Sequence, residues 1–108
     1  SKIGEPHLSF TCRKVPGGKM STYMHENLKE GDVVKLAPPC GTFMAPGAAE
    51  GAVLITAGVG ITPAWAMVNN YGCKMIKGAI HVDKTEEHDG FRPRFEEAGV
   101  HAKTFYTG

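Results

Sequence analysis

The sequence has little charge imbalance and no long apolar run. Its 12 Lys and Arg residues against 11 Asp and Glu residues leave a formal net charge of +1. This balance gives no electrostatic reason to expect nucleic acid or an anionic membrane as a partner. No apolar run reaches the roughly 18 residues that indicate a membrane-spanning helix, and no secretory signal pattern occurs. We therefore expect a cytoplasmic protein without nucleic-acid or membrane partners.

The sequence is also poor in metal-binding patterns. Its three cysteines, Cys12, Cys40 and Cys73, are widely spaced and form neither a CxxC pair nor a zinc pattern with histidine. The five histidines contain no HExxH motif. We expect reduced thiols and no metal site.

The first half of the chain shows short elements separated by turns. Residues 7–13 alternate in polarity, which predicts a half-buried antiparallel strand. A helix is predicted from Ser21, as its N-cap, to Gly31, followed by a strand over 31–39 that ends at two prolines. The Gly- and Pro-containing stretch from Ala45 to Ala52 is the best linker candidate.

The second half has the pattern of a parallel sheet. Residues 52–57 are continuously apolar, as expected of a strand covered on both faces. A helix is predicted over 62–72 with Thr62 as N-cap, Pro63 at the first helical position and Gly72 at its end. A strand over 74–82, a helix over 89–99 capped by Asp89, and a strand over 100–107 follow. This alternation predicts helical crossovers between parallel strands.

Two glycine-containing turns are candidate phosphate sites. Gly17 and Gly18 precede a predicted helix whose first N–H groups and Ser21 hydroxyl suit an anion, although a simple capped helix is the commoner explanation. The sequence Gly58-Val59-Gly60-Ile61-Thr62-Pro63 lies between a buried strand and a helix, where nucleotide loops occur. An ordinary strand-to-helix turn explains that second pattern equally well.

Three residues near the end of the next strand are further candidates. His81 stands where ligands gather in open α/β sheets, and a nucleotide contact and a surface position are equally open for it. Asp83 and Lys84 lie where a protein could recognise the ribose of a nucleotide or its 2′-phosphate. We favour NADH over NADPH, because Asp83 suits a free ribose hydroxyl, although the adjacent Lys84 could suit a 2′-phosphate.

The two turns, in this order, resemble the ferredoxin–NADP reductase superfamily, and most strongly the reductase part of flavohaemoglobins. The shared motifs are Gly-Gly-x-x-Ser (Gly17 to Ser21), Gly31-Asp32, Pro-x-Gly-x-Phe (Pro39 to Phe43) and Gly-x-Gly-x-Thr-Pro (Gly58 to Pro63). Together they extend over nearly the whole chain from about His7.

The resemblance implies a role for each motif. The turn of Gly18, Lys19, Met20 and Ser21 would bind the FAD pyrophosphate, and Cys12 and Arg13 would lie along the flavin through their backbone. The loop of Gly58, Val59, Gly60, Ile61, Thr62 and Pro63 would bind NADH or NADPH. Thr62 would be the catalytic residue near the nicotinamide, and His81 would face the nucleotide.

The resemblance also implies the fold class and the function. We expect an α/β chain with a partial antiparallel flavin-binding barrel over residues 1–46 and a partial parallel-sheet nucleotide-binding domain over 47–108. Because the family's Arg-x-Tyr-Ser and Cys-Gly-Pro segments do not occur in this sequence, we expect an internal piece of a longer enzyme. The expected activity is hydride transfer from NAD(P)H to FAD, followed by electron transfer to a haem or another acceptor. A nucleotide- or partner-binding module and an inactive fragment are the alternatives.

Overall fold

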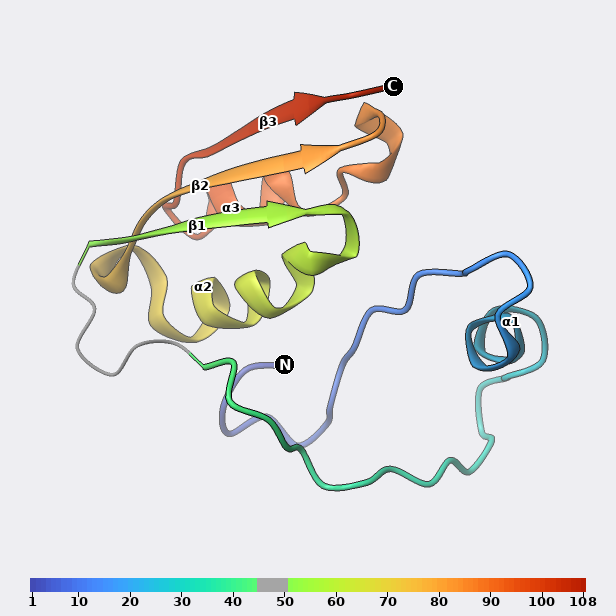
Figure 1. Ribbon diagram of the computed structural model, residues 1–108. Helices are drawn as coiled ribbons and strands as arrows, with labels where there is room; N and C mark the ends of the chain where they lie inside the picture. Colours follow the sequence, from blue (N-terminus) through green and yellow to red (C-terminus); the bar gives the residue numbers. More distant parts are fainter. Residues whose placement is uncertain (45–50) are drawn as a thin grey trace. The chain divides into compact units, whose positions relative to one another are not determined.

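The computed structural model describes residues 1–44 and 51–108 of the chain (Figure 1). These residues form two compact units. One is Thr11–Met44, and the other combines Ser1–Phe10 with the described residues of Ala45–Gly108. The predicted linker lies almost entirely within residues 45–50, outside the described residues. The division into domains 1–46 and 47–108 therefore stays a prediction.

The larger unit contains a three-stranded parallel sheet in the order β1-β2-β3 (Figure 1). Its elements in chain order are β1 (Ala52–Ala57), η1 (Gly58–Gly60), α2 (Ile61–Met75), β2 (Ile76–Asp83), η2 (Glu86–His88), α3 (Arg92–Glu97) and β3 (Ala102–Tyr106). The predicted parallel sheet with helical crossovers is thus confirmed. Because such crossovers are right-handed and the strands lie in sequence order, α2 and α3 cover the same face of the sheet.

The helix-covered face of the sheet contains the core of this unit. Phe95 of α3, Val68 of α2 and Val100 are each about 1% exposed, and Trp65 stacks on Phe95 with ring centroids 5.8 Å apart. On the opposite face, Ile55 of β1 remains 77% exposed. The prediction that β1 is covered on both faces is therefore wrong for the described residues. The physical reason is that both crossover helices lie on one side.

Helix α2 begins two residues earlier than predicted. The 3-10 turn η1 continues directly into it, so that Gly60 is the N-cap, and Thr62 and Pro63 occupy the second and third helical positions. The predicted cap at Thr62 is wrong, but Pro63 is tolerated because N–H groups of the first turn have no intrahelical partner. Gly72 interrupts the helix with a φ of 63°, which agrees with its predicted role as a breaker.

Helix α3 also starts differently from the prediction. Phe91, not Asp89, is its N-cap, and no side chain caps it. Asp89 instead accepts a hydrogen bond from the Tyr106 hydroxyl at 3.1 Å, which ties the segment before α3 to β3. Pro93 lies in the first turn, as expected.

The smaller unit contains one helix, α1 (Lys19–Glu26), which is shorter than predicted at its C-terminal end. Gly18 is its N-cap, and the predicted cap Ser21 lies inside the first turn. The strands predicted over 7–13 and 31–39 do not form in the described residues. Their alternating side chains have no packed surface beneath them, since Val33 is 94% and Phe10 61% exposed. An extended segment without a paired neighbour is not a strand.

Replacing Phe95 with alanine should destabilise the larger unit by about 3–5 kcal/mol, because it leaves a cavity beneath the sheet. The matched control is Phe105→Ala, which removes a side chain that is 49% exposed on the opposite face. Urea unfolding followed by the fluorescence of Trp65, the sole tryptophan, measures both changes. Equal losses of stability in the two variants would contradict the assignment of the core.

Candidate functional site

The N-terminus of α1 is the first candidate site. The turn before this helix is held by hydrogen bonds within the turn and to the first turn of α1. The Gly18 N–H donates to the Val15 carbonyl at 2.8 Å, and the Val15 N–H donates to Ser21 Oγ at 3.0 Å. A Cβ atom on Gly18 would lie 2.6 Å from Ser21 Oγ, so a larger residue here would disturb the hydrogen bond between Ser21 and Val15. The first intrahelical bond comes from the Thr22 N–H. The N–H groups of Lys19, Met20 and Ser21 precede it, as in an anion site.

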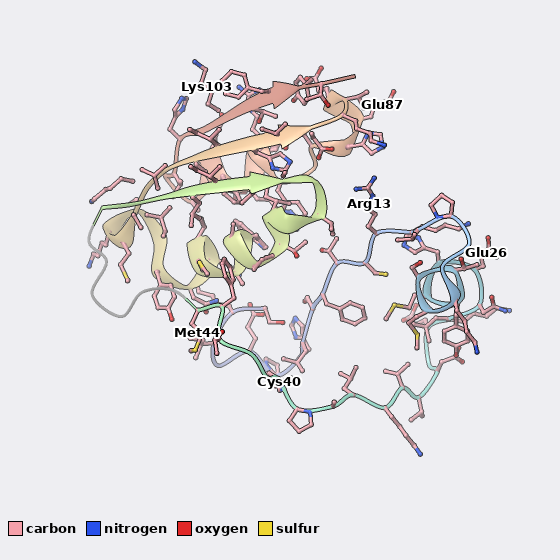
Figure 2. All side chains as sticks on the ribbon, viewed as in Figure 1. Arg13, Glu26, Cys40, Met44, Glu87 and Lys103 are labelled. Carbon is pink, nitrogen blue, oxygen red and sulfur yellow. The ribbon has the colours of Figure 1, made fainter. Side chains whose placement is uncertain are left out.

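The segment before this turn is tied to α1. The Cys12 carbonyl lies 2.8 Å from His25 Nε2, and Lys14 Nζ lies 2.6 Å from Oε1 of Glu26, which Figure 2 labels on the helix. The imidazole thus already occupies the carbonyl of Cys12. Arg13 is exposed. The N–H groups of this segment and the Arg13 carbonyl can still make backbone contacts to a ligand. Among the described residues, the Arg13 carbonyl has only a weak contact, from Cys12 Sγ at 3.8 Å.

The loop after β1 is the second candidate site, in the larger unit. Gly58 has a φ of 53°, a conformation that favours glycine, and the Ile61 N–H bonds back to the carbonyls of Gly58 and Val59. No atom lies within 4 Å of a Cβ built on Gly60, so the space above that residue is open. Thr62 is half-buried and Pro63 is exposed. The loop presents backbone at the carboxyl end of a parallel strand, where ligands bind in open sheets.

A polar group lies beneath the loop, within the helix-covered face of the sheet. His81 is 2% exposed, so the predicted surface alternative for this residue is wrong. Its Nδ1 atom lies 2.8 Å from Thr56 Oγ1, and its Nε2 atom lies 3.0 Å from Asp83 Oδ2. Strand β2 extends to Asp83, so His81 lies inside the strand rather than at its end. Thr56, His81 and Asp83 are called the relay below.

The environment of Asp83 combines opposing effects on its pKa. Burial raises the pKa, but the hydrogen bond from the Lys84 N–H, the hydrogen bond with His81 and the nearby charges of His81 and His88 outweigh it. The pKa of Asp83 is therefore held below its usual value of 3.8. The carboxylate is ionised at neutral pH and accepts hydrogen bonds on both oxygens.

The sequence did not predict that Thr56 and Thr104 lie on either side of His81 in the sheet. Thr56 pairs with His81 in the register of β1 and β2, and His81 pairs with Thr104 in the register of β2 and β3. The Thr104 hydroxyl is buried without a partner among residues 1–44 and 51–108. A signal was present, because Thr56 interrupts an apolar strand, but its significance depends on the strand register.

The structure separates the predicted site residues into two sets. Cys12, Arg13 and the turn from Gly18 to Ser21 belong to the smaller unit, whereas the loop from Gly58 to Pro63 and His81 belong to the larger. The donors fit the predicted cofactors, since α1 offers N–H groups and a hydroxyl for a pyrophosphate. No atom lies within 4 Å of a Cβ built on Gly60, so a ligand group has room to approach the backbone there. Within the described parts of the chain, no three metal-ligating side chains gather, and no helix has the length and apolar character to cross a membrane.

No protein-family model matches the chain. It is 37% identical over 103 residues to a flavohemoprotein of Bacillus subtilis, covering 92% of this chain and 25% of that protein. It is 33% identical over 96 residues to NADH-cytochrome b5 reductase 2 of Mycosarcoma maydis, covering 84% of this chain and 27% of that protein. The chain spans 15% to 27% of the length of its first curated relatives.

A solved structure shares the fold. It is the flavohem-like FAD/NAD-binding domain of nitric oxide dioxygenase from Vibrio cholerae, which matches 82% of this chain and 40% of its own with a TM-score of 0.74 and 28% identity. The expected resemblance to the ferredoxin–NADP reductase superfamily is therefore confirmed. More particularly, the chain is similar to the FAD/NAD-binding reductase part of flavohaemoproteins.

The lowered pKa of Asp83 predicts an acid-dependent loss of stability. The native state binds fewer protons at this group than the unfolded state, so its contribution is complete above the usual pKa of 3.8 and is lost as pH falls through the lower native value. Asp83→Asn should lower stability at pH 7 by about 1–3 kcal/mol. The variant should also lose less stability than the parent between about pH 5 and pH 2.

Urea unfolding at a series of pH values measures this difference. Glu97→Gln, which removes an exposed carboxylate on α3, is the matched control and should follow the parent. An Asp83→Asn curve parallel to the parent over the whole acid range would show that the relay does not hold the carboxylate ionised.

Proposed function

We propose that this chain is part of a flavin-dependent oxidoreductase that passes a hydride from NADH or NADPH to FAD and electrons onward to a haem or another acceptor. The observation that carries the proposal is the loop from Gly58 to Gly60, whose backbone opens into free space at the carboxyl end of β1. The similarity of most of the chain to flavohemoproteins supports the same activity. The bound flavin would supply the hydride-accepting and electron-passing chemistry.

The loop residues have distinct roles in this proposal. Gly58 provides the left-handed turn, and Gly60 allows the nucleotide phosphates to approach the backbone. The first turn of α2 supplies N–H groups and the positive end of a helix dipole. Thr62 is proposed as the residue near the nicotinamide, because its half-buried hydroxyl lies in that first turn. His81 stays a predicted neighbour of the nucleotide.

The flavin would be held by the smaller unit. The N–H groups of Lys19, Met20 and Ser21 and the Ser21 hydroxyl are proposed to bind its pyrophosphate. The hydroxyl proton of Ser21 remains available for this, since its oxygen acts as an acceptor towards Val15. The backbone of Cys12 and Arg13 is proposed to lie along the flavin. A partial antiparallel barrel over 1–46, a partial nucleotide-binding domain over 47–108 and a cytoplasmic location belong to the same proposal.

The activity is tested with the reconstituted full-length protein that contains this chain. We expect flavin absorbance that bleaches on addition of NADH or NADPH, and turnover with an added electron acceptor. The alternative is a binding module without turnover. Nucleotide binding without bleaching of the flavin would support that alternative, and no response to FAD, NADH or NADPH would overturn both.

Gly60→Ala should weaken NADH binding by roughly tenfold, about 1.4 kcal/mol, because a methyl group would fill the space proposed for the phosphates. The fold should tolerate it, since the φ of Gly60 is −61° and no atom lies within 4 Å of the new Cβ. Gly90→Ala is the matched control, because that glycine also has open space around it. Titration calorimetry with NADH measures the difference. Equal affinities in the two variants would remove Gly60 from the site.

A further inference from the structure

With a neutral His81 imidazole, the relay allows one arrangement of protons. An ionised carboxylate can only accept hydrogen bonds, so the Nε2 atom of His81, 3.0 Å from Asp83 Oδ2, must carry the proton. In a neutral imidazole the Nδ1 atom is then an acceptor, and the Thr56 hydroxyl donates to it across 2.8 Å. The hydrogen bonds therefore fix both the tautomer and the orientation of the ring.

Both carboxylate oxygens of Asp83 accept a hydrogen bond in this arrangement. Its Oδ2 atom binds His81, its Oδ1 atom accepts the Lys84 N–H at 2.8 Å, and its side chain is 10% exposed. The strand backbone around it is also held, because the Asp83 and Lys84 carbonyls accept N–H groups of Thr107 and Gly108 at 2.9 and 2.8 Å. A ribose hydroxyl would have to approach a carboxylate that is mostly buried and already accepts a hydrogen bond on each oxygen.

Lys84, in contrast to Asp83, is exposed to solvent. Its backbone is clamped by the same hydrogen bonds, but the residue is exposed. Lys84 follows Gly60 by 24 residues, close to the roughly 20 residues after which Rossmann-type sheets place the group that recognises the adenosine ribose. The exposed charge at the end of β2 is therefore a cation, and the anion beside it is turned into the sheet.

We propose that Asp83 is the positioning residue of His81, locking its imidazole with the proton on Nε2, and that Lys84 is the residue that meets the ribose 2′ position of the nucleotide. This inference rests on the proposed function for its second half. It assigns the selectivity between NADH and NADPH to Lys84, and Asp83 then no longer favours NADH. By tying the end of β1 to β2, the relay also fixes the strand from which the loop at Gly58 starts.

The first half is tested without any nucleotide. Nitrogen-15 NMR of the imidazoles in the unliganded chain should show a protonated Nε2 and an unprotonated Nδ1 for His81. The exposed His101 serves as an internal reference with averaged tautomers. Asp83→Asn and Thr56→Val should each give His81 a mixture of tautomers. A parent His81 with its proton on Nδ1, or with averaged tautomers, would overturn the positioning role.

The second half is tested by the ratio of dissociation constants for NADH and NADPH. Lys84→Gln should weaken NADPH relative to NADH by up to about fivefold, the range of an exposed ion pair. Asp83→Asn should change both constants together and leave their ratio within about twofold. A ratio that shifts with Asp83→Asn but not with Lys84→Gln would reassign the selectivity to Asp83. If neither nucleotide binds the parent chain, the proposed function fails, and with it the role of Lys84, while the NMR result on His81 stands.

Discussion

Burial of one face of the parallel sheet by α2 and α3 is the constraint on which the larger unit depends. Phe95, Val68 and Val100 are almost completely removed from water against that face. Because the strands lie in sequence order, both right-handed crossovers bring their helices to the same side. Without this packing the loop after β1 would have no fixed strand and no fixed helix to join.

The polar relay is the exception within this apolar layer, and its position is informative. A buried polar group costs free energy unless it is hydrogen-bonded, and both ring nitrogens of His81 have partners. The relay lies at the carboxyl-end half of the strands, directly beneath the glycine loop. A core that served stability alone would use apolar side chains there. The proposed role in holding the loop and orienting a charge toward solvent gives this polar row a function.

Much of the larger unit could be predicted from the sequence, and the reasons for the errors are physical. The parallel sheet and its crossovers follow from apolar strands alternating with helical periodicity. The helix starts were misplaced because Gly60 and Phe91 cap without a side-chain hydrogen bond. In the first half of the chain, residues 7–13 and 31–39 have strand-like alternation, but alternation yields a strand only where another segment supplies hydrogen-bond partners.

The sequence by itself determined the order of the elements, the two glycine turns and the resemblance to flavin reductases, because these depend on local conformational preference and on motif order. Only the tertiary structure decided which polar side chains meet. Asp83 and His81 share a face because they lie two residues apart on β2. Thr56 joins them because of strand register, and register is a relation between segments rather than a property of either one. Because the helices cover the face that carries His81 and Asp83, Asp83, which in the sequence is a candidate to recognise a ribose, is turned into the sheet, while its neighbour Lys84 remains in solvent.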